Sequence, residues 1–298
     1  MRVILMQPTI TSRNNPTVKW LASLSEKKYR DASRSFICEG EKLFAEAAAA
    51  RLPITHVVLS ETSAERLLAF VETNLAADRY AETTVLVLSE SCFEKISTEK
   101  SPQGLLVVLK YLDNCKYCNK IYKEEFFSFC SGPLLLLESL RDPGNVGAVL
   151  RTAAGLGMAG VVMTADCADI FAPKTLRAAM GGLFHLKVLL VPDLTEVIAL
   201  LRAAGRRVFA AALSDEALSL ASVRLQPLDA VVIGNEGQGI SDRVARSCEG
   251  SVCIPLVPHT ESLNAAVAAA IIIWEQMKER LSDTTPPVPE TSPLSEQG

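Results

Sequence analysis

Three short stretches of the chain carry side chains that can bind a polar ligand and align a reacting group. The stretches are ESLRDPGNVGAVLRTA (138–153), VVIGNEGQGIS (231–241) and VCIPLVPHTESLNAAVAAA (252–270). Their candidate functional residues are Asn145, Arg151, Glu236, Ser262 and Asn264. Amides, a guanidinium, a carboxylate and a hydroxyl can form one site only if the fold brings the three stretches together.

Each stretch also has an interpretation that involves no ligand. Asn145, Ser262 or Asn264 could cap a helix, because short polar side chains accept hydrogen bonds from the free N–H groups of a first turn. Arg151 could be a solvated surface residue. The glycines around Glu236 could form an ordinary turn, although a turn does not need the carboxylate.

The elements that carry these stretches alternate between strand and helix from about residue 132 onward. Apolar runs such as PLLLLESL and DAVVIG indicate strands, and helices are expected over 145–156, 240–247 and 264–281. This alternation predicts an α/β fold with a parallel sheet covered on both faces. Because ligands bind outside the carboxyl ends of such strands, we expect the three stretches to meet there.

The stretch GLGMAG (155–160) matches the G-x-G-x-x-G pattern of dinucleotide-binding proteins. In those proteins the motif follows a strand and opens a helix. Here it follows a helical pattern and precedes the strand-like VVMTA. We therefore predict that Gly155 or Gly157 ends a helix in the left-handed conformation and that no dinucleotide binds.

Composition restricts the possible classes of protein. The 298 residues are 49% hydrophobic with a net charge of −4, which indicates a folded protein that needs a local basic surface to contact RNA. The sequence shows no membrane span and no secretion signal, so we expect a cytoplasmic protein. Only Cys115 and Cys118, in CKYC, have the spacing of metal ligands, and a second pair is missing, so no metal is expected.

The chain divides into four predicted segments. Residues 1–110 mix helix and strand patterns and form a small α/β domain. Residues 111–131 are read as a linker or insertion, and residues 132–281 as the larger parallel-sheet domain. The tail over 282–298 is rich in Pro, Ser, Thr and Glu and is expected to be disordered.

The motifs DPGNVGAVLRTA, IGNEGQGIS and IPLVPHTESLNAAVAAA, in this order, closely resemble those of the SpoU/TrmH branch of the SPOUT RNA methyltransferases. The resemblance covers about residues 132–280. FICEGEKLFAEA (36–47) resembles part of the ribosomal-protein-like RNA-binding domain that often precedes this fold. The resemblance implies a parallel-sheet SPOUT domain with a trefoil knot, an exception to the usual absence of threaded loops.

The resemblance also implies an activity. Family members transfer the methyl group of S-adenosylmethionine (AdoMet) to a ribose 2′-hydroxyl of rRNA or tRNA, need no metal, and form homodimers through this domain. The residues implied in cofactor binding are Leu213, Gly234, Ile254 and Leu263. Arg151 is implied to activate or orient the hydroxyl, and the other polar motif residues to arrange the RNA and the loops. Since arginine stays protonated in proteins, binding an adjacent phosphate is its easier role.

A cationic cluster near the N-terminus could supply the local basic surface. Its members are Arg13, Lys19, Lys27, Lys28, Arg30 and Arg34, interleaved with Trp20 and Tyr29. We predict RNA contacts by Arg13, Lys19, Lys28 and Arg34, with large-subunit rRNA preferred over tRNA. The alternatives are an ordinary solvated helix face and, for the whole chain, a non-catalytic RNA-binding or ribosome-assembly protein.

Overall fold

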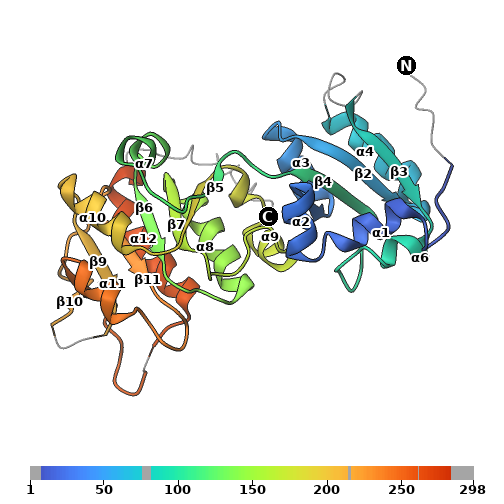
Figure 1. Cartoon of the computed structure of the whole chain (residues 1–298). Helices are drawn as coiled ribbons and strands as arrows, with labels where there is room; N and C mark the ends of the chain where they lie inside the picture. Colours follow the sequence, from blue (N-terminus) through green and yellow to red (C-terminus); the bar gives the residue numbers. More distant parts are fainter. Residues whose placement is uncertain (1–7, 76–81, 214–215, 261, 283–298) are drawn as a thin grey trace, which may run out of the picture.

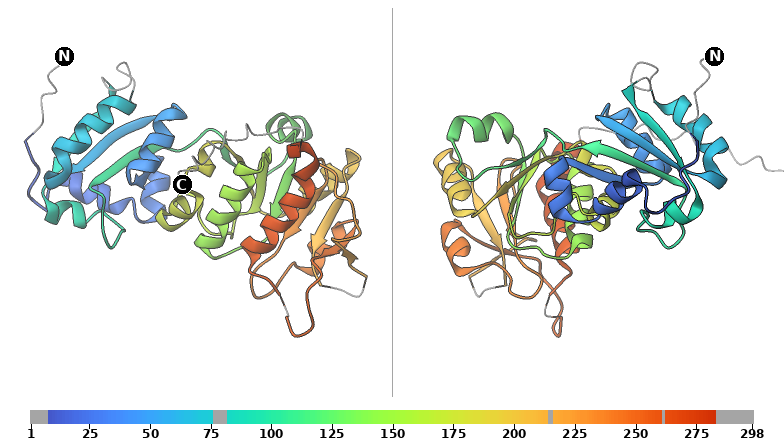
Figure 2. Two further views of the ribbon diagram at one scale, coloured as in Figure 1. Left: turned by 180° about the vertical axis from the view of Figure 1, so that it is seen from behind. Right: turned by 45° about the vertical axis from the view of Figure 1, so that its right-hand side comes forward.

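The computed structural model describes residues 8–75, 82–213, 216–260 and 262–282. They form two α/β units, one blue to cyan and the other green to red in Figure 1. The views in Figure 2 show the same two units in contact along one side. Apart from Ser282, the predicted tail lies outside the described residues. No helix in the described part of the chain is long and apolar enough to cross a bilayer.

The smaller unit contains a four-stranded sheet in the order β1-β4-β2-β3. Its strands are β1 (Ser35–Glu39), β2 (Ile54–Ser60), β3 (Thr84–Leu88) and β4 (Leu105–Lys110). Its helices are α1 (Pro16–Ser23), α2 (Lys27–Ser33), α3 (Glu41–Ala49), η1 (Glu61–Ser63), α4 (Ala64–Asn74) and α6 (Glu90–Glu94). Alternate side chains of β4 point to opposite faces, so Leu105 packs with α3 and α4 and Leu106 with α1 and α6. Both faces are therefore covered.

The larger unit contains an eight-stranded sheet in the order β10-β12-β9-β11-β6-β7-β8-β5, and every neighbouring pair is parallel. Its strands are β5 (Cys115–Tyr117), β6 (Leu134–Leu137), β7 (Gly160–Thr164), β8 (Lys187–Val191), β9 (Val208–Ala211), β10 (Leu218–Ser219), β11 (Ala230–Ile233) and β12 (Gly250–Cys253). The prediction of a parallel sheet is confirmed.

Helices cover both faces of this sheet, as predicted. One face packs against α8 (Pro143–Gly155), α9 (Pro173–Ala179), η2 (Gly182–Phe184) and α12 (Ala265–Ser282). The other packs against α7 (Lys123–Phe129), α10 (Thr195–Ala203) and α11 (Asp242–Ser247). The trefoil knot implied by the resemblance stays a prediction.

The segment 111–131, predicted as a linker or insertion, contributes structure to the larger unit. Strand β5 pairs with β8 at the sheet edge, and Phe126 of α7 is buried in the core on one face. Cys115 and Cys118 lie at and just after this strand. Within the described residues, no three His, Cys, Asp or Glu side chains gather where they could hold a metal.

The GLGMAG stretch joins a helix to a strand, as predicted. Helix α8 ends at Gly155, Gly157 has φ +76°, and β7 begins at Gly160. A residue in this left-handed conformation commonly follows a helix end, and glycine adopts it without strain. The stretch therefore cannot act as a dinucleotide-binding loop.

Candidate active site

The three polar stretches leave the sheet at the same edge. Leu137 and Ile233, the last residues of β6 and β11, are paired in register, so the loops that follow start side by side. The third stretch follows β12, which is separated from β11 only by β9. This arrangement agrees with the expectation that ligands bind beyond the carboxyl ends of parallel strands.

A cavity of about 670 Å³ lies at this edge, within the range typical of small-molecule sites. It is formed by the segments after β9, β11 and β12 and by the first turns of α12. The predicted site residues that line it are Leu213, Gly234, Glu236, Ile254, Ser262, Leu263 and Asn264. Asn145 and Arg151 are not among its lining residues.

Hydrogen bonds connect one residue from each stretch. The Asn145 amide donates from Nδ2 to Oε1 of Glu236 at 3.0 Å, and its Oδ1 accepts from Nδ2 of Asn264 at 3.0 Å. Asn145 therefore lies between the other two and uses both ends of its amide. The structure brings together three of the five residues predicted to act in catalysis.

Glu236 also holds the first loop through backbone groups. Its Oε1 accepts from the N–H of Asp142 at 3.1 Å and its Oε2 from the N–H of Arg141 at 3.4 Å. Partial burial raises the pKa of Glu236, but the hydrogen bonds from Asn145, Asp142 and Arg141 outweigh it and hold the pKa below its usual value. The carboxylate is therefore ionised at neutral pH and acts as an acceptor for the first loop.

Asp142, not Asn145, caps helix α8. Its Oδ1 accepts from the N–H of Asn145 at 2.9 Å, and Pro143 occupies the first helical position. The capping interpretation of Asn145 is thus wrong, and its side chain is free to join the other two loops. An Asp followed by Pro was the signal for this cap, since Asp is favoured at the N-cap and Pro at the first helical position.

The second loop is closed by its own backbone and by Asn235. The N–H and C=O groups of Asn235 and Gly239 pair at 2.9 and 3.0 Å, and Gly239 has φ +69°. The Asn235 side chain accepts from the N–H groups of Gly237 and Gln238 and donates to the carbonyl of Ser139 at 2.8 Å. Asn235 therefore shapes this loop and attaches it to the first one, a role that the sequence analysis missed.

Asn264 has two roles. Its Oδ1 accepts from the N–H groups of Ala266 and Val267, so it caps α12, while its Nδ2 donates to Asn145. The capping interpretation of Asn264 and its prediction as a site residue are compatible, because the amide has two different ends. Ser262 lies on the cavity wall without a hydrogen bond to the described residues.

Arg151 lies apart from this network. Its side chain is exposed on α8 and forms no hydrogen bond or ion pair with the described residues. Six residues along a helix place it roughly 9 Å further along the axis than Asn145 and about 120° around it. A Cβ added to Gly182 would lie only 2.9 Å from the Arg151 Cα, so η2 packs directly on α8 at this point. The guanidinium has no partner among the described residues and is available to bind a ligand.

Comparisons with known proteins extend these observations. The SpoU rRNA Methylase family matches residues 133–274, and the MRM3-like substrate binding domain matches residues 15–107. The 23S rRNA (guanosine(2553)-2'-O)-methyltransferase RlmP of Bacillus subtilis is 30% identical over 265 residues, which cover 89% of this chain and 97% of that protein. The chain belongs to the SpoU rRNA methylase family.

Further relatives agree with this family. A 23S rRNA (uridine(2479)-2'-O)-methyltransferase of Streptomyces viridochromogenes is 28% identical over 289 residues, covering 94% of this chain and 95% of that protein. The crystal structure of an AdoMet-bound rRNA methyltransferase from Sinorhizobium meliloti superposes with a TM-score of 0.75 at 27% identity, covering 92% and 98% of the two chains. The predicted family, the SPOUT type of fold and the methylase class are confirmed.

The cavity of this SpoU family member fits AdoMet, which combines an adenine ring with a charged amino-acid part. Its wall offers apolar side chains, such as Leu256 and Ile272, beside the carboxylate of Glu236 and the backbone of the glycine-rich loop. Leu213 is 65% exposed at the cavity, so its side chain is accessible to a ligand. Gly234, Ile254 and Leu263, implied as cofactor residues by the resemblance, belong to the same wall.

Replacing Glu236 with glutamine is expected to weaken AdoMet binding about tenfold, because each hydrogen bond to a charged group contributes about 1.5–3 kcal/mol. A glutamine places an NH₂ group against one of the N–H donors of the first loop. Isothermal titration calorimetry measures the change. The matched control is Glu196→Gln, at an exposed position on α10 across the sheet, which should bind AdoMet normally. An unchanged AdoMet affinity in Glu236→Gln would show that the hydrogen-bond network does not contribute to cofactor binding.

Proposed function

We propose that this protein transfers the methyl group of AdoMet to a ribose 2′-hydroxyl in 23S rRNA. The observation that carries the proposal is the hydrogen-bonded group of Asn145, Glu236 and Asn264 beside a cavity of suitable size. When bound, AdoMet supplies an activated methyl group on a positively charged sulfur. The protein must then align the hydroxyl with it and assist loss of the hydroxyl proton.

The chain's residues divide this work. Asn145, Glu236 and Asn264 hold the three loops in place, and Ser262 contacts the RNA or the cofactor from the cavity wall. Arg151 binds the phosphate next to the target ribose and thereby orients the hydroxyl. Because arginine stays protonated in proteins, a charge-assisted hydrogen bond to phosphate is easier for it than proton removal.

Large-subunit rRNA is the proposed substrate rather than tRNA. The smaller unit matches a substrate binding domain, and two relatives that this chain covers almost completely are named as 23S rRNA methyltransferases. A tRNA substrate is the second possibility, because another relative is named as an uncharacterized tRNA/rRNA methyltransferase. An rRNA substrate favours a cytoplasmic location.

The test uses the full chain, AdoMet with a tritium-labelled methyl group, and unmodified transcripts of 23S rRNA and of total tRNA. We expect label in 23S rRNA, and none when the target nucleotide, once mapped, is replaced by its 2′-deoxy form. Label in tRNA alone would overturn the substrate assignment. Binding of RNA without binding of AdoMet in calorimetry would instead support the non-catalytic alternative.

Surface cations of the smaller unit are proposed to bind RNA phosphates. Arg13, Lys19, Lys28 and Arg34 are all exposed, around and on helices α1 and α2. Arg30 is not one of them, because it is buried and ion-paired. Because its guanidinium is buried, Arg30 does not belong to the surface cluster that was predicted from the sequence.

Lys19→Gln and Lys28→Gln are each expected to lower the slope of log affinity against log salt by roughly 0.7–0.9, the effect of one lost phosphate contact. Fluorescence anisotropy with labelled RNA at several salt concentrations measures the slope. Lys42→Gln, at an exposed position on α3, serves as the control. If all three variants kept the wild-type slope, the RNA would bind to a different surface of the protein.

Helix α12 has an exposed apolar face that a second copy of the chain is proposed to cover. Val267 and Trp274 are about half exposed, and Ile271 lies between them at helical spacing. Trp274→Glu is expected to convert a dimer into a monomer at micromolar concentration in sedimentation velocity. Tyr122→Glu, an equally exposed aromatic residue near α7, should remain dimeric. A wild-type monomer would overturn the proposed dimer.

A further inference from the structure

Arg30 is a buried cation at the junction of the two units. Its side chain is 3% exposed, although it belongs to the short helix α2 at the surface of the smaller unit. Its Nη1 donates to the carbonyls of Leu24 and Ser25 at 2.8 and 2.7 Å, and its Nη2 donates to Oδ2 of Asp169 at 2.6 Å. Asp169 belongs to the larger unit, so this ion pair crosses the junction.

Asp169 is equally fixed on its own side. Its Oδ1 accepts from the N–H of Phe171 at 2.9 Å, and its carbonyl accepts from the hydroxyl of Thr175, in α9, at 2.8 Å. The preceding residue, Ala168, donates its N–H to the carbonyl of Leu140 at 2.9 Å. Leu140 lies in the first polar loop, two residues before the cap of α8. Asp169 is therefore attached, through the neighbouring Ala168, to the first polar loop of the candidate site.

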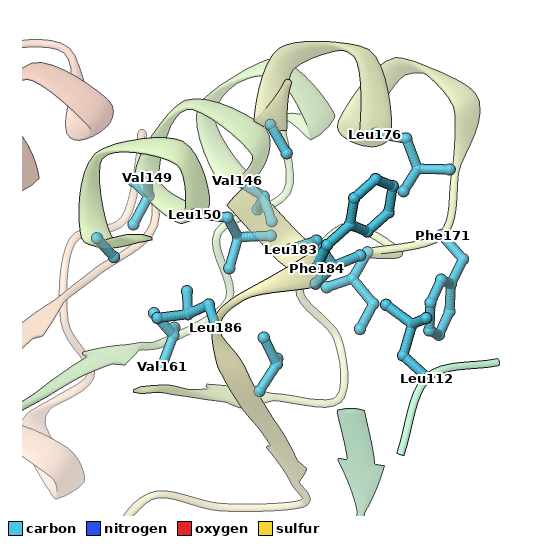
Figure 3. Close-up of a cluster of buried hydrophobic side chains, with 14 of the residues drawn as sticks. Leu112, Val146, Val149, Leu150, Val161, Phe171, Leu176, Leu183, Phe184 and Leu186 are labelled. Atoms are coloured by element: carbon cyan, nitrogen blue, oxygen red, sulfur yellow. The ribbon is translucent and has the colours of Figure 1, made fainter. Parts of the chain in front are cut away.

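Aromatic rings lie beside the ion pair at the junction. Phe171 stacks on Tyr111 at a centroid distance of 4.2 Å and contacts Phe36 at 4.7 Å. The Tyr111 hydroxyl donates to Asp31 at 2.7 Å. Figure 3 shows Leu112 beside Phe171 in the same apolar cluster. These contacts join β1, α2 and the end of β4 to the loop before α9.

Such a junction favours a single orientation. Apolar contacts alone allow sliding, whereas a buried ion pair is strongly destabilised when either partner is moved away from the other. Desolvated charges with several hydrogen bonds each can therefore specify one arrangement of two domains. Figure 1 shows α2 and α9 next to each other at this junction.

We propose that Arg30 and Asp169 are positioning residues: their ion pair sets the orientation of the smaller unit relative to the cavity, and so determines which nucleotide of a bound RNA reaches the cavity. This proposal rests on the proposed function. It gives Arg30 a role different from the phosphate-binding role of the exposed cations around it.

The test compares Asp169→Asn, Arg30→Lys and the double variant with the wild-type chain. Asparagine retains Oδ1 for the Phe171 N–H but can place an NH₂ group against the Arg30 guanidinium. Lysine retains the charge but cannot reach all three acceptors at once. The controls are Arg66→Lys and Glu41→Gln, which alter an exposed ion pair of 2.9 Å within the smaller unit.

Four readouts are needed. Hydrogen exchange should become faster in residues 24–34 and 168–172 and stay unchanged in the strands β6 to β9. In the methyl-transfer assay, kcat/KM for 23S rRNA should fall at least about tenfold, since a displacement of about 1 Å can cost far more. AdoMet affinity should stay within about twofold, and methylation should spread to neighbouring nucleotides. The double variant should resemble the single ones, because the residues act as one pair.

Unchanged exchange at the junction, or wild-type kcat/KM with methylation at the same nucleotide, would overturn the proposal. A loss of AdoMet binding in these variants would also overturn it, because it would indicate general destabilisation. If the wild-type chain transfers no methyl group, the proposed function fails by itself. The proposal for the junction is then tested by hydrogen exchange and by whether Asp169→Asn changes the RNA footprint on the larger unit.

Discussion

Replacing Arg151 with alanine is expected to lower methyl transfer by about 10²–10³-fold, the typical effect of removing a charge-stabilising group from an active site. AdoMet affinity should not change, because Arg151 does not line the cavity and forms no bond with the loops that do. Initial rates on 23S rRNA and calorimetry with AdoMet measure the two quantities. Arg151→Lys should recover only part of the rate, since an ammonium cannot bind a phosphate in bidentate fashion.

The exposed position of Arg151 allows it to act on its own cavity or on that of a partner chain. Mixing Arg151→Ala with a second inactive variant whose cavity is damaged distinguishes the two cases. If Arg151 acts on the partner, mixed dimers restore up to about one quarter of the sites. If it acts within its own chain, mixing restores nothing. Full activity of Arg151→Ala would remove this residue from the mechanism altogether.

Gly234→Ala is expected to weaken AdoMet binding by about 100-fold or more, because two polypeptide segments would have to separate. A Cβ at this position would lie 2.4 Å from both the carbonyl carbon and oxygen of Gly239 and 2.5 Å from the nitrogen of Ile240. These are backbone atoms, which cannot rotate away as a flexible side chain can. The loop that ends in Gly239 and forms one wall of the cavity would therefore open.

Gly237→Ala is the matched control for this prediction. Gly237 belongs to the same loop, its φ is not in the left-handed region, and the nearest atom to an added Cβ is 3.7 Å away. This variant should bind AdoMet like the wild-type protein. Equal affinities for Gly234→Ala and Gly237→Ala would show that the close approach at Gly234 does not shape the cofactor site.

The sequence predicted the site because its residues follow strands that end at one edge of a parallel sheet. The spacing of apolar residues and the composition identify such strands. Because ligands bind beyond the carboxyl ends of parallel strands, Asn145, Glu236 and Asn264 are then expected to lie together. The sequence left open whether the glycines around Glu236 form an ordinary turn or part of a ligand site. In the structure, the close approach at Gly234 is to the protein's own backbone, which no local pattern could indicate.

Other features depended on contacts between distant segments. Arg30 resembles its cationic neighbours in sequence, and only the packing of the two units buries it against Asp169, 139 residues later. Strand β1 was missed because its five residues lie between two helices and pair with β4, some 70 residues away. Asp142 had a local signal, the following proline, but Asn145 competed with it for the same capping role.

Asn264 joins the stability of a helix to the shape of the cavity. One amide group closes the first turn of α12 with its oxygen and contacts Asn145 with its nitrogen. Aspartate or serine could replace the cap, yet aspartate has no N–H to donate and serine is too short to do both. Fraying of that turn would therefore release the Asn145 amide as well. Order in the methyl-donor pocket and the stability of the proposed dimer helix are thus coupled.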